Sequence, residues 1–116
     1  MNDNNWLNRT QLLIGDAALQ KLSKAHVMVV GLGGVGAYAA EFIARSGVGK
    51  MTIVDGDVVE ESNRNRQLLA LQTTMGKNKA LLMAERLYDI NPAIELNIIQ
   101  DFVHPEMVEK LLSLKP

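Results

Sequence analysis

The feature that most limits the fold of this chain is a glycine pattern, Gly-Leu-Gly-Gly-Val-Gly, at residues 31–36. It follows directly on the apolar run 26–30, which predicts a strand buried on both faces because its hydrophobicity does not alternate. An alanine-rich stretch through Arg45 comes next, with apolar residues at helical spacing. A strand, a glycine turn and a helix in this order are typical of a phosphate-binding corner.

Each glycine of the pattern has its own physical task in such a corner. Gly31 permits the tight turn, Gly33 lets a phosphate approach the backbone, and Gly36 lets helix and strand pack closely. Free N–H groups and positive partial charge at the helix N-terminus attract a phosphate. Asp55 ends the next apolar run, where a carboxylate can accept hydrogen bonds from a ribose. A glycine turn that only packs a helix on a sheet would leave Asp55 unexplained.

The rest of the chain predicts alternating helices and strands. We expect a helix over 16–23 capped by Asp16, strands over 50–55 and 94–99, a helix C-cap at Gly47, and helices over 77–90 and 105–112. Right-handed crossovers convert that order into a parallel sheet. The predicted fold class is α/β, a Rossmann-like parallel sheet with helices on both faces.

The predicted domain organisation is simple. Residues 1–116 form the N-terminal part of a single domain, with a helical segment over 1–24 and a Rossmann-like half over 25–116. Three parallel strands make a thin core, so we expect the sheet to be truncated here and the chain to be the front of a longer protein.

Amino-acid composition limits the cellular location and the binding partners that we expect for this protein. The formal net charge of -1 gives no global electrostatic reason to expect DNA, RNA or an anionic membrane. The absence of cysteine removes disulfides, thiolate zinc sites and cysteine nucleophiles from these residues. No apolar run approaches the roughly 20 residues that span a bilayer, and the polar start does not look like a secretory signal. We therefore expect a cytoplasmic protein.

A group of basic residues bears on which nucleotide is bound. Arg64 and Arg66 follow the second predicted strand, and Lys77 and Lys79 open the next helix. One such residue alone would be a solvated loop charge, but four beside a phosphate loop favour a triphosphate and a leaving pyrophosphate. The alternative is an NAD-binding oxidoreductase, because a nicotinamide dinucleotide needs little beyond the glycine turn and Asp55.

From Arg9 to about residue 112, the chain resembles the ubiquitin-activating-type ThiF/MoeB/HesA adenylating family. The matching motifs are Arg9 with Leu12-Leu13-Ile14-Gly15, Val30 to Gly36, Asp55-Gly56-Asp57-Val58-Val59, Ser62-Asn63 with Asn65-Arg66-Gln67, and Gly76 to Lys79 with Ile90-Asn91-Pro92. Residues 61–67 and 101–105 are most similar to the tRNA threonylcarbamoyladenosine dehydratase branch.

The resemblance implies ATP-dependent activation of a carboxylate by adenylation, with release of pyrophosphate. In the dehydratase branch the carboxylate belongs to threonylcarbamoyladenosine of tRNA, and a ring closes by dehydration. The alternative acceptor is the C-terminal glycine of a ubiquitin-like sulfur carrier, as in ThiF and MoeB. ATP and Mg²⁺ are the implied cofactors, tRNA or the sulfur carrier is the implied substrate, and neither DNA nor a membrane is an expected partner.

The resemblance also implies residue roles. The implied catalytic residues are Arg9, Arg66 and Lys79, and the implied ATP-binding residues are Gly31, Gly33, Gly34, Gly36, Asp55, Asp57, Asn63, Arg66, Gln67 and Lys79. Arg9 looks like the family's arginine finger, which reaches the ATP of the other subunit of a homodimer. Arg64 and Lys77 have no secure counterpart and are expected to be loop charges.

Some of the family's functional residues would lie beyond residue 116. They include the magnesium-associated aspartate and the zinc-binding or catalytic cysteines of some members. We therefore expect no metal ligand in this chain, and we expect these 116 residues alone to be inactive. A non-catalytic nucleotide-binding or dimerisation fragment is the third interpretation.

Overall fold

The computed structural model describes residues 5–116. Its main elements are α1 (Asn8–Lys24), β1 (His26–Val30), α2 (Gly36–Arg45), β2 (Lys50–Val54), α3 (Lys79–Ile90), β3 (Glu95–Ile99) and α4 (Val108–Leu112), with short 3-10 turns at Asn5–Leu7, Glu61–Asn63, Gln72–Thr74 and Pro105–Met107. The strands form one parallel sheet in the order β1-β2-β3. The predicted α/β, Rossmann-like class is confirmed.

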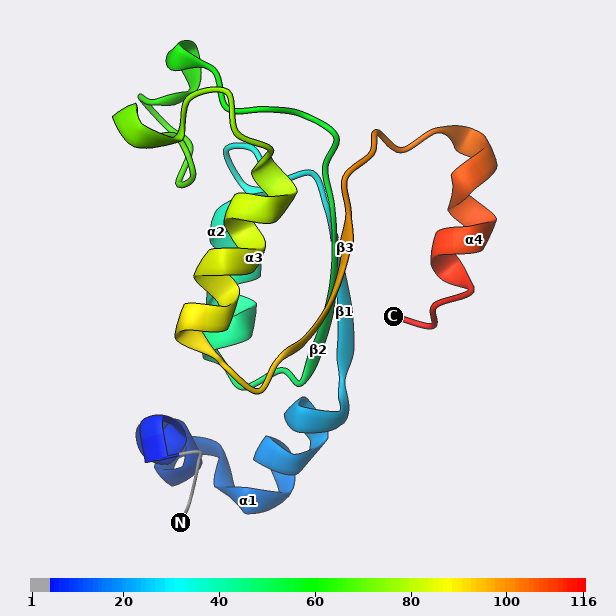
Figure 1. The fold of residues 1–116 in the computed structure, drawn as a ribbon. Coiled ribbons are helices and arrows are strands. Elements are labelled where there is room, and N and C mark those ends of the chain that lie inside the picture. Colours follow the sequence, from blue (N-terminus) through cyan, green and yellow to red (C-terminus); the bar gives the residue numbers. More distant parts are fainter. Residues whose placement is uncertain (1–4) are drawn as a thin grey trace.

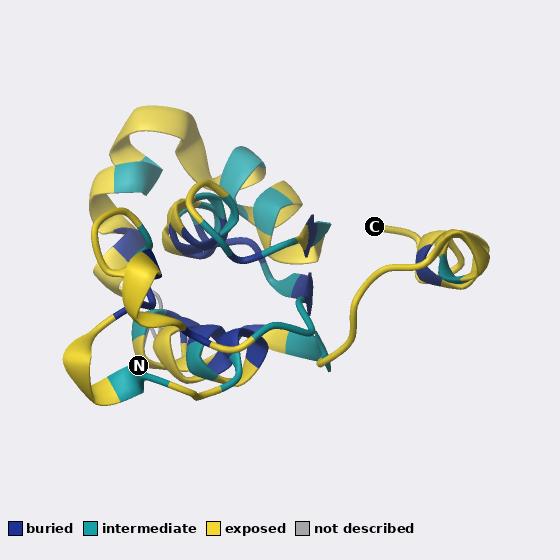
Figure 2. Cartoon of the chain, turned by 90° about the horizontal axis from the view of Figure 1, so that it is seen from above, coloured by how far each residue is buried: buried dark blue, intermediate teal, exposed yellow. Residues whose placement is uncertain are grey.

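Helices lie on both faces of the sheet, as predicted, but they cover the two faces unequally. Helices α2 and α3 pack side by side on one face, and α4 stands on the other (Figure 1). Most of the buried residues lie between the sheet and the α2–α3 layer, whereas α4 stands apart and is largely exposed (Figure 2). Leu111 is the buried residue of α4.

Side-chain alternation along the strands explains this core. Met51 and Ile53 of β2 are fully buried in the cluster with Ala40 and Ala44 of α2 and Met83 of α3. Residues two apart on a strand face the same side of the sheet, so one set of apolar residues contacts both helices. The small alanines allow α2 to approach the sheet closely.

Local signals set most of the helix ends. The Asn78 Oδ1 accepts a hydrogen bond of 3.1 Å from the Leu81 N–H, so α3 begins at Lys79, two residues later than predicted. Gly47 has a φ of +98°, and its N–H donates to the Ala44 oxygen at 3.2 Å. This left-handed residue confirms the predicted C-cap of α2.

The N-terminal helix differs from the prediction of a single helix over 16–23. The structure extends α1 back to Asn8 and breaks it at Gly15, where φ is 83° and ψ is 168°. The carboxylate of Asp16 accepts a hydrogen bond from the side-chain amide of Gln11, which ties it to the turn before the break. Residues 1–4 of the predicted segment lie outside the described residues. Across residues 5–116, the helices are too short or too polar to cross a membrane.

Candidate nucleotide-binding site

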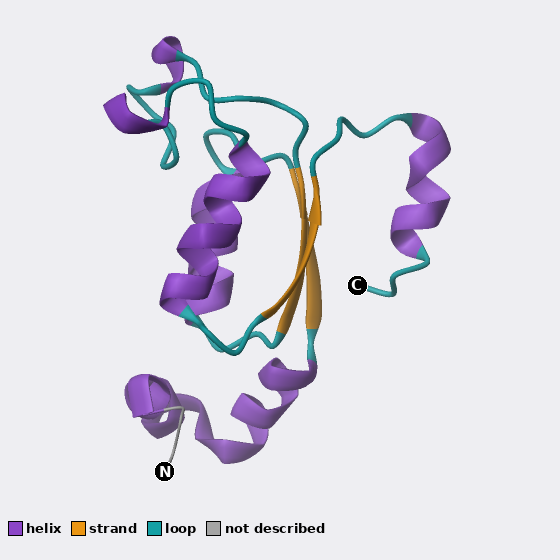
Figure 3. Cartoon of the chain, viewed as in Figure 1, coloured by secondary structure: helices purple, strands orange, loops and turns teal. Residues whose placement is uncertain are grey.

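The glycine turn lies at the carboxyl end of β1, at the edge of the sheet where the three strands end (Figure 3). Gly31 has a φ of +87°, a backbone conformation that glycine adopts without strain. A Cβ on Gly36 would lie 1.7 Å from the Gly31 oxygen, so α2 can start against the turn only with glycine there. Both the tight turn and the close approach predicted from the sequence are present.

The middle of the turn is open to a ligand. A Cβ on Gly34 would have no atom within 4 Å, and one on Gly33 would contact only the side chain of Gln67, at 3.5 Å or more. Of the residues described, none caps the N-terminus of α2 with its side chain. The backbone at the start of a ten-residue helix is therefore available to an anion.

Asp55 connects this turn to the end of β2. Its Oδ2 accepts a hydrogen bond of 2.7 Å from the Leu32 N–H, and its Oδ1 accepts one of 2.8 Å from the Asp57 N–H. Each carboxylate oxygen has a further lone pair. The carboxylate can thus hold the glycine turn and accept a bond from a sugar hydroxyl at the same time.

Lys79 occupies the first turn of α3 and points back to the same edge. Its side chain is only 6% exposed, and its Nζ lies 3.5 Å from the Asp57 Oδ2. The Lys79 N–H also donates to the Asp57 carbonyl oxygen at 3.0 Å. A buried ammonium with one carboxylate partner is a fixed positive charge that a polyphosphate could also neutralise.

Gln67 provides an independent indication of a missing partner. Its Nε2 lies on the side of Gly33, while its Oε1 is buried and accepts no hydrogen bond from any residue that the structure describes. A buried, unpaired acceptor is costly and calls for a donor from a ligand or water. The amide nitrogen of Gln67, which lies beside the open glycine turn, is a donor from which a phosphate oxygen could accept a hydrogen bond.

Two predicted site residues, Asn63 and Arg66, form hydrogen bonds within their own loop. Asn63 is 8% exposed, and its Oδ1 accepts a bond of 2.9 Å from the Glu60 N–H. Arg66 is exposed, and its Nη1 donates to the Ser62 oxygen and the Asn65 Oδ1, both at 3.0 Å. The side-chain hydrogen bonds that the described residues give to Asn63 and Arg66 thus all lie within the 60–67 loop, and none reaches the glycine turn.

Arg9 lies farthest from the other predicted site residues. It belongs to the first turn of α1 and is exposed. Helix α1 sits beyond the amino ends of the strands, at the opposite end of the sheet from the glycine turn (Figure 1). Arg9 therefore does not join the site of its own chain.

One neighbour of the site, the segment after β3, was not predicted from the sequence. A Cβ on Gly56 would lie 2.6 Å from the Phe102 nitrogen and 2.7 Å from the Asp101 carbonyl carbon. The backbone after β3 therefore crosses directly over the turn that follows Asp55, and it brings the half-exposed Phe102 ring to this edge. A glycine between Asp55 and Asp57 indicates that the backbone there is closely approached. It does not indicate by what, because Asp101 and Phe102 are distant in sequence.

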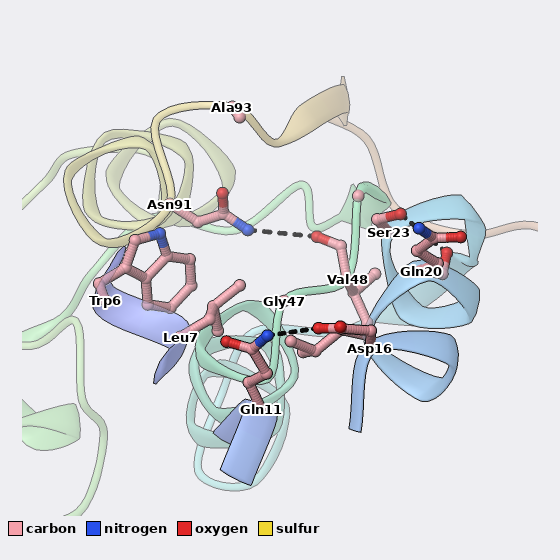
Figure 4. Close-up of a pocket in the computed structure, with 12 residues that line it drawn as sticks. Trp6, Leu7, Gln11, Asp16, Gln20, Ser23, Gly47, Val48, Asn91 and Ala93 are labelled. Carbon is pink, nitrogen blue, oxygen red and sulfur yellow. Dashed lines mark hydrogen bonds between the residues drawn. The ribbon is translucent and has the colours of Figure 1, made fainter. Parts of the chain in front are cut away.

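A separate cavity of about 480 Å³ lies at the other end of the molecule, between α1 and the amino ends of the strands (Figure 4). It is lined by Trp6, Leu7, Gln11, Asp16, Leu19, Gln20, Ser23, Gly47, Val48, Gly49, Asn91 and Ala93. None of the predicted nucleotide-binding residues is among them. Residues 5–116 also gather no group of three acidic or histidine side chains that could hold a metal ion.

A parallel sheet with a glycine turn, a carboxylate and a buried lysine at its carboxyl edge defines the class of Rossmann-like nucleotide-binding proteins. Within that class, the chain belongs to the ThiF family, whose model matches residues 7–115. The resemblance stated from the sequence is confirmed.

Individual relatives refine this assignment. The chain is 46% identical to the tRNA threonylcarbamoyladenosine dehydratase of Escherichia coli K12, over 94% of this chain and 42% of that protein. It is 38% identical to the sulfur carrier protein ThiS adenylyltransferase of the same organism, over 97% of this chain and 47% of that protein.

A solved structure gives the same result. The chain is similar to the E. coli tRNA N6-threonylcarbamoyladenosine dehydratase TcdA in complex with ATP, with a TM-score of 0.90 and 44% identity. This match covers 93% of the present chain and 44% of that one. The chain thus spans less than half the length of these relatives.

Proposed function

We propose that the full-length protein carrying this chain activates the carboxylate of threonylcarbamoyladenosine in tRNA with ATP, in the cytoplasm, and that ring closure with loss of water follows. The geometry that supports it is the single corner formed by the glycine turn, Asp55 and the side-chain amide nitrogen of Gln67. The similarity to dehydratases of that name favours this acceptor, and it favours ATP over a nicotinamide dinucleotide.

The reaction is an attack on the α-phosphorus of ATP by a carboxylate oxygen. A new bond forms between them, the bond from the α-phosphorus to the bridging oxygen breaks, and pyrophosphate leaves with the electron pair. An enzyme lowers the barrier of such a transfer mainly by positioning the reactants and by stabilising the charge that develops on the phosphates. The protein's task is therefore to place cations and N–H donors around the phosphates.

The residues of the corner divide that task. The N-terminus of α2 donates to phosphate oxygens, Asp55 accepts from the ribose hydroxyls, and Lys79 neutralises charge on the departing pyrophosphate. Gly33 and Gly34 keep the approach to the backbone open. Gln67, whose Nε2 lies beside Gly33, donates a hydrogen bond to a phosphate oxygen.

Three further residues complete the proposed site. Arg66, exposed in its loop, turns its guanidinium to the phosphates, beside the amide of Asn63. Arg9 reaches the ATP of the other subunit in a homodimer, because its own glycine turn lies at the far end of the sheet. Mg²⁺, whose protein ligand is expected outside these 116 residues, would be held by the phosphate oxygens and would supply charge neutralisation in the transfer.

Adenylation of the C-terminal glycine of a ubiquitin-like sulfur carrier is the second candidate. The similarity to the ThiS adenylyltransferase over nearly the whole chain supports it. Both reactions use the same attack on ATP, so they differ only in the acceptor.

Radiolabelled pyrophosphate exchange into ATP tests the proposal in the full-length protein. We expect exchange to depend on added tRNA that carries threonylcarbamoyladenosine, and to be unchanged by tRNA that lacks the modification. Exchange stimulated by a sulfur carrier ending in glycine would transfer the assignment to the second candidate. Tight binding of NADH without binding of ATP would overturn both.

A further inference from the structure

Residues 5–14 form an arm that is set apart from the rest of the chain. The arm comprises a 3-10 turn at Asn5–Leu7 and the first half of α1. It joins the second half of α1 at Gly15, whose φ of 83° and ψ of 168° lie in a region open almost only to glycine. A Cβ at Gly15 would meet no atom within 4 Å, so the bend is not forced by crowding.

Leu7 is the buried residue of this arm. It is 6% exposed, whereas Leu12 and Leu13 in the same arm are 85% and 84% exposed. Its side chain packs on Gly47, where a Cβ would lie 3.1 Å from the Leu7 Cδ1 (Figure 4). The left-handed glycine that ends α2 therefore also provides the surface on which the arm is seated.

Among residues 5–116, the arm has few other contacts. The side-chain amide of Gln11 donates to the carboxylate of Asp16 across the bend. Beneath the arm lies the cavity of about 480 Å³ that Trp6 and Leu7 help to line. A segment with one buried apolar contact above a cavity opens at low cost in free energy, so its position depends strongly on that contact.

Arg9 is two residues beyond Leu7 and points to solvent. We infer that Leu7, seated on Gly47, is a positioning residue that fixes the arm and so sets where Arg9 is presented to a second subunit. This inference rests on the proposed role of Arg9 in the other subunit's site. Leu7 itself touches neither substrate nor nucleotide.

The decisive experiment is a double-mutant cycle on pyrophosphate exchange in the full-length protein, with Leu7→Ala, Arg9→Ala and the double variant. We expect Leu7→Ala to lower kcat about tenfold while the KM for ATP changes less than about twofold, because only charge stabilisation in the transition state is lost. The double variant should be no slower than Arg9→Ala alone. Leu111→Ala is the matched control, since Leu111 is also 6% exposed but lies on α4, and it should leave kcat unchanged.

Other outcomes separate the two hypotheses. Full activity of Leu7→Ala beside an impaired Arg9→Ala would overturn the role of Leu7 and leave the proposed function intact. Full activity of Arg9→Ala would overturn its role in the other subunit, and this inference with it. Additive losses in the double variant would show that Leu7 acts by another route, and would also overturn the inference.

Hydrogen–deuterium exchange supplies a readout that does not depend on activity. In Leu7→Ala we expect faster exchange over residues 8–14 and unchanged exchange in the three strands. Faster exchange throughout the chain would mean that Leu7 is only a general stability residue, and would overturn the inference. Leu7→Met conserves volume and should restore both kcat and arm protection; Leu7→Val, a smaller truncation, should give an intermediate loss.

Discussion

The Nζ of Lys79 lies 3.5 Å from the Oδ2 of Asp57, and the lysine side chain is only 6% exposed. The two residues are also joined through the backbone, from the Lys79 N–H to the Asp57 oxygen at 3.0 Å. The start of α3 is therefore attached to the turn that follows β2. A positive charge held in this way loses little side-chain entropy when a phosphate arrives.

Removing that charge should remove activity. We expect Lys79→Ala to slow pyrophosphate exchange at least about 100-fold, which is the usual cost of losing one charge-stabilising donor. The control is Lys77→Ala, because Lys77 is exposed at the same loop end and should tolerate the change. Equal losses in both variants would contradict the assignment of Lys79.

Asp57→Asn tests the same pair from the other side. It leaves a buried ammonium without its carboxylate, but Asp57 is 47% exposed, so solvent screens much of the interaction. We expect the free energy of unfolding to fall by about 1 kcal/mol, measured by urea denaturation. An unchanged unfolding midpoint would mean that the ion pair does not stabilise the fold.

Two arginines of one loop form a matched pair. Arg64 and Arg66 are both exposed, but only Arg66 belongs to the proposed phosphate site. We expect Arg66→Ala to lower the exchange rate at least about tenfold and Arg64→Ala to change it less than about twofold. Neither should change stability by more than about 0.5 kcal/mol. Similar rates for the two variants would exclude a specific role for Arg66.

Substitution by alanine should lower the stability of the protein at one glycine of the turn and leave it unchanged at another. In Gly36→Ala the new methyl group would lie 1.7 Å from the Gly31 oxygen, so α2 must shift. We expect a loss of at least about 2 kcal/mol in the free energy of unfolding and loss of ATP binding. Gly34→Ala meets open space and should retain stability. Thermal unfolding with and without ATP measures both effects.

The orphaned oxygen of Gln67 predicts a separation of stability from affinity. Gln67→Met removes a buried acceptor that has no partner among the described residues, so the free chain should be as stable as before or more stable. ATP affinity, measured by calorimetry on the full-length protein, should fall about fivefold to tenfold through loss of one hydrogen bond. Unchanged affinity would mean that the side chain of Gln67 makes no hydrogen bond to ATP.

Glu41 of α2 gives the expected pH dependence. The side-chain hydrogen bond from Arg86 lowers the pKa of its carboxyl below the ordinary 4.5, with a further contribution from the charge of Arg45, against the opposing effect of burial. Because the pKa of Glu41 is lower in the folded state than in the unfolded state, its ionised carboxylate stabilises the fold at pH values above the unfolded-state pKa. This stabilisation is lost as the pH falls through the folded-state pKa. We therefore expect stability to decline below about pH 4.5.

Glu41→Gln should reduce the unfolding free energy at pH 7 by about 1–2 kcal/mol and flatten its decline between about pH 5 and pH 3. Glu85 of α3 is exposed, so Glu85→Gln serves as the control and should leave the pH profile unchanged. An identical pH profile in wild type and Glu41→Gln would contradict the pKa assignment.

Much of the fold could be predicted because its signals are local. The strand before Gly31, the turn itself and the C-cap at Gly47 each depend on a few neighbouring residues. Most element ends shifted by one or two positions, as at Lys79, but α1 begins eight residues earlier than predicted and α4 three residues later. The helical segment before Gly15 was missed because a glycine directly before a candidate cap, Asp16, looks like the start of a helix and not like a bend inside one.

The candidate site was less predictable. Asp55 and the glycine turn follow from strand ends in a parallel sheet, which must meet at one edge. The burial of Lys79 beside Asp57 and the crossing of Phe102 over Gly56 do not follow from any local pattern. Asn63 and Arg66 were assigned by resemblance, and the structure gives them contacts within their own loop.

The sequence by itself determined the order of helices and strands and the positions where only glycine is tolerated, because backbone preferences act between neighbouring residues. Only the tertiary structure decided that Lys79 is buried beside Asp57, that Glu41 is paired with Arg86, and that Leu7 rests on Gly47. Those contacts join residues from different elements. Their geometry depends on how α2 and α3 pack on the sheet, and this packing is a property of the whole core.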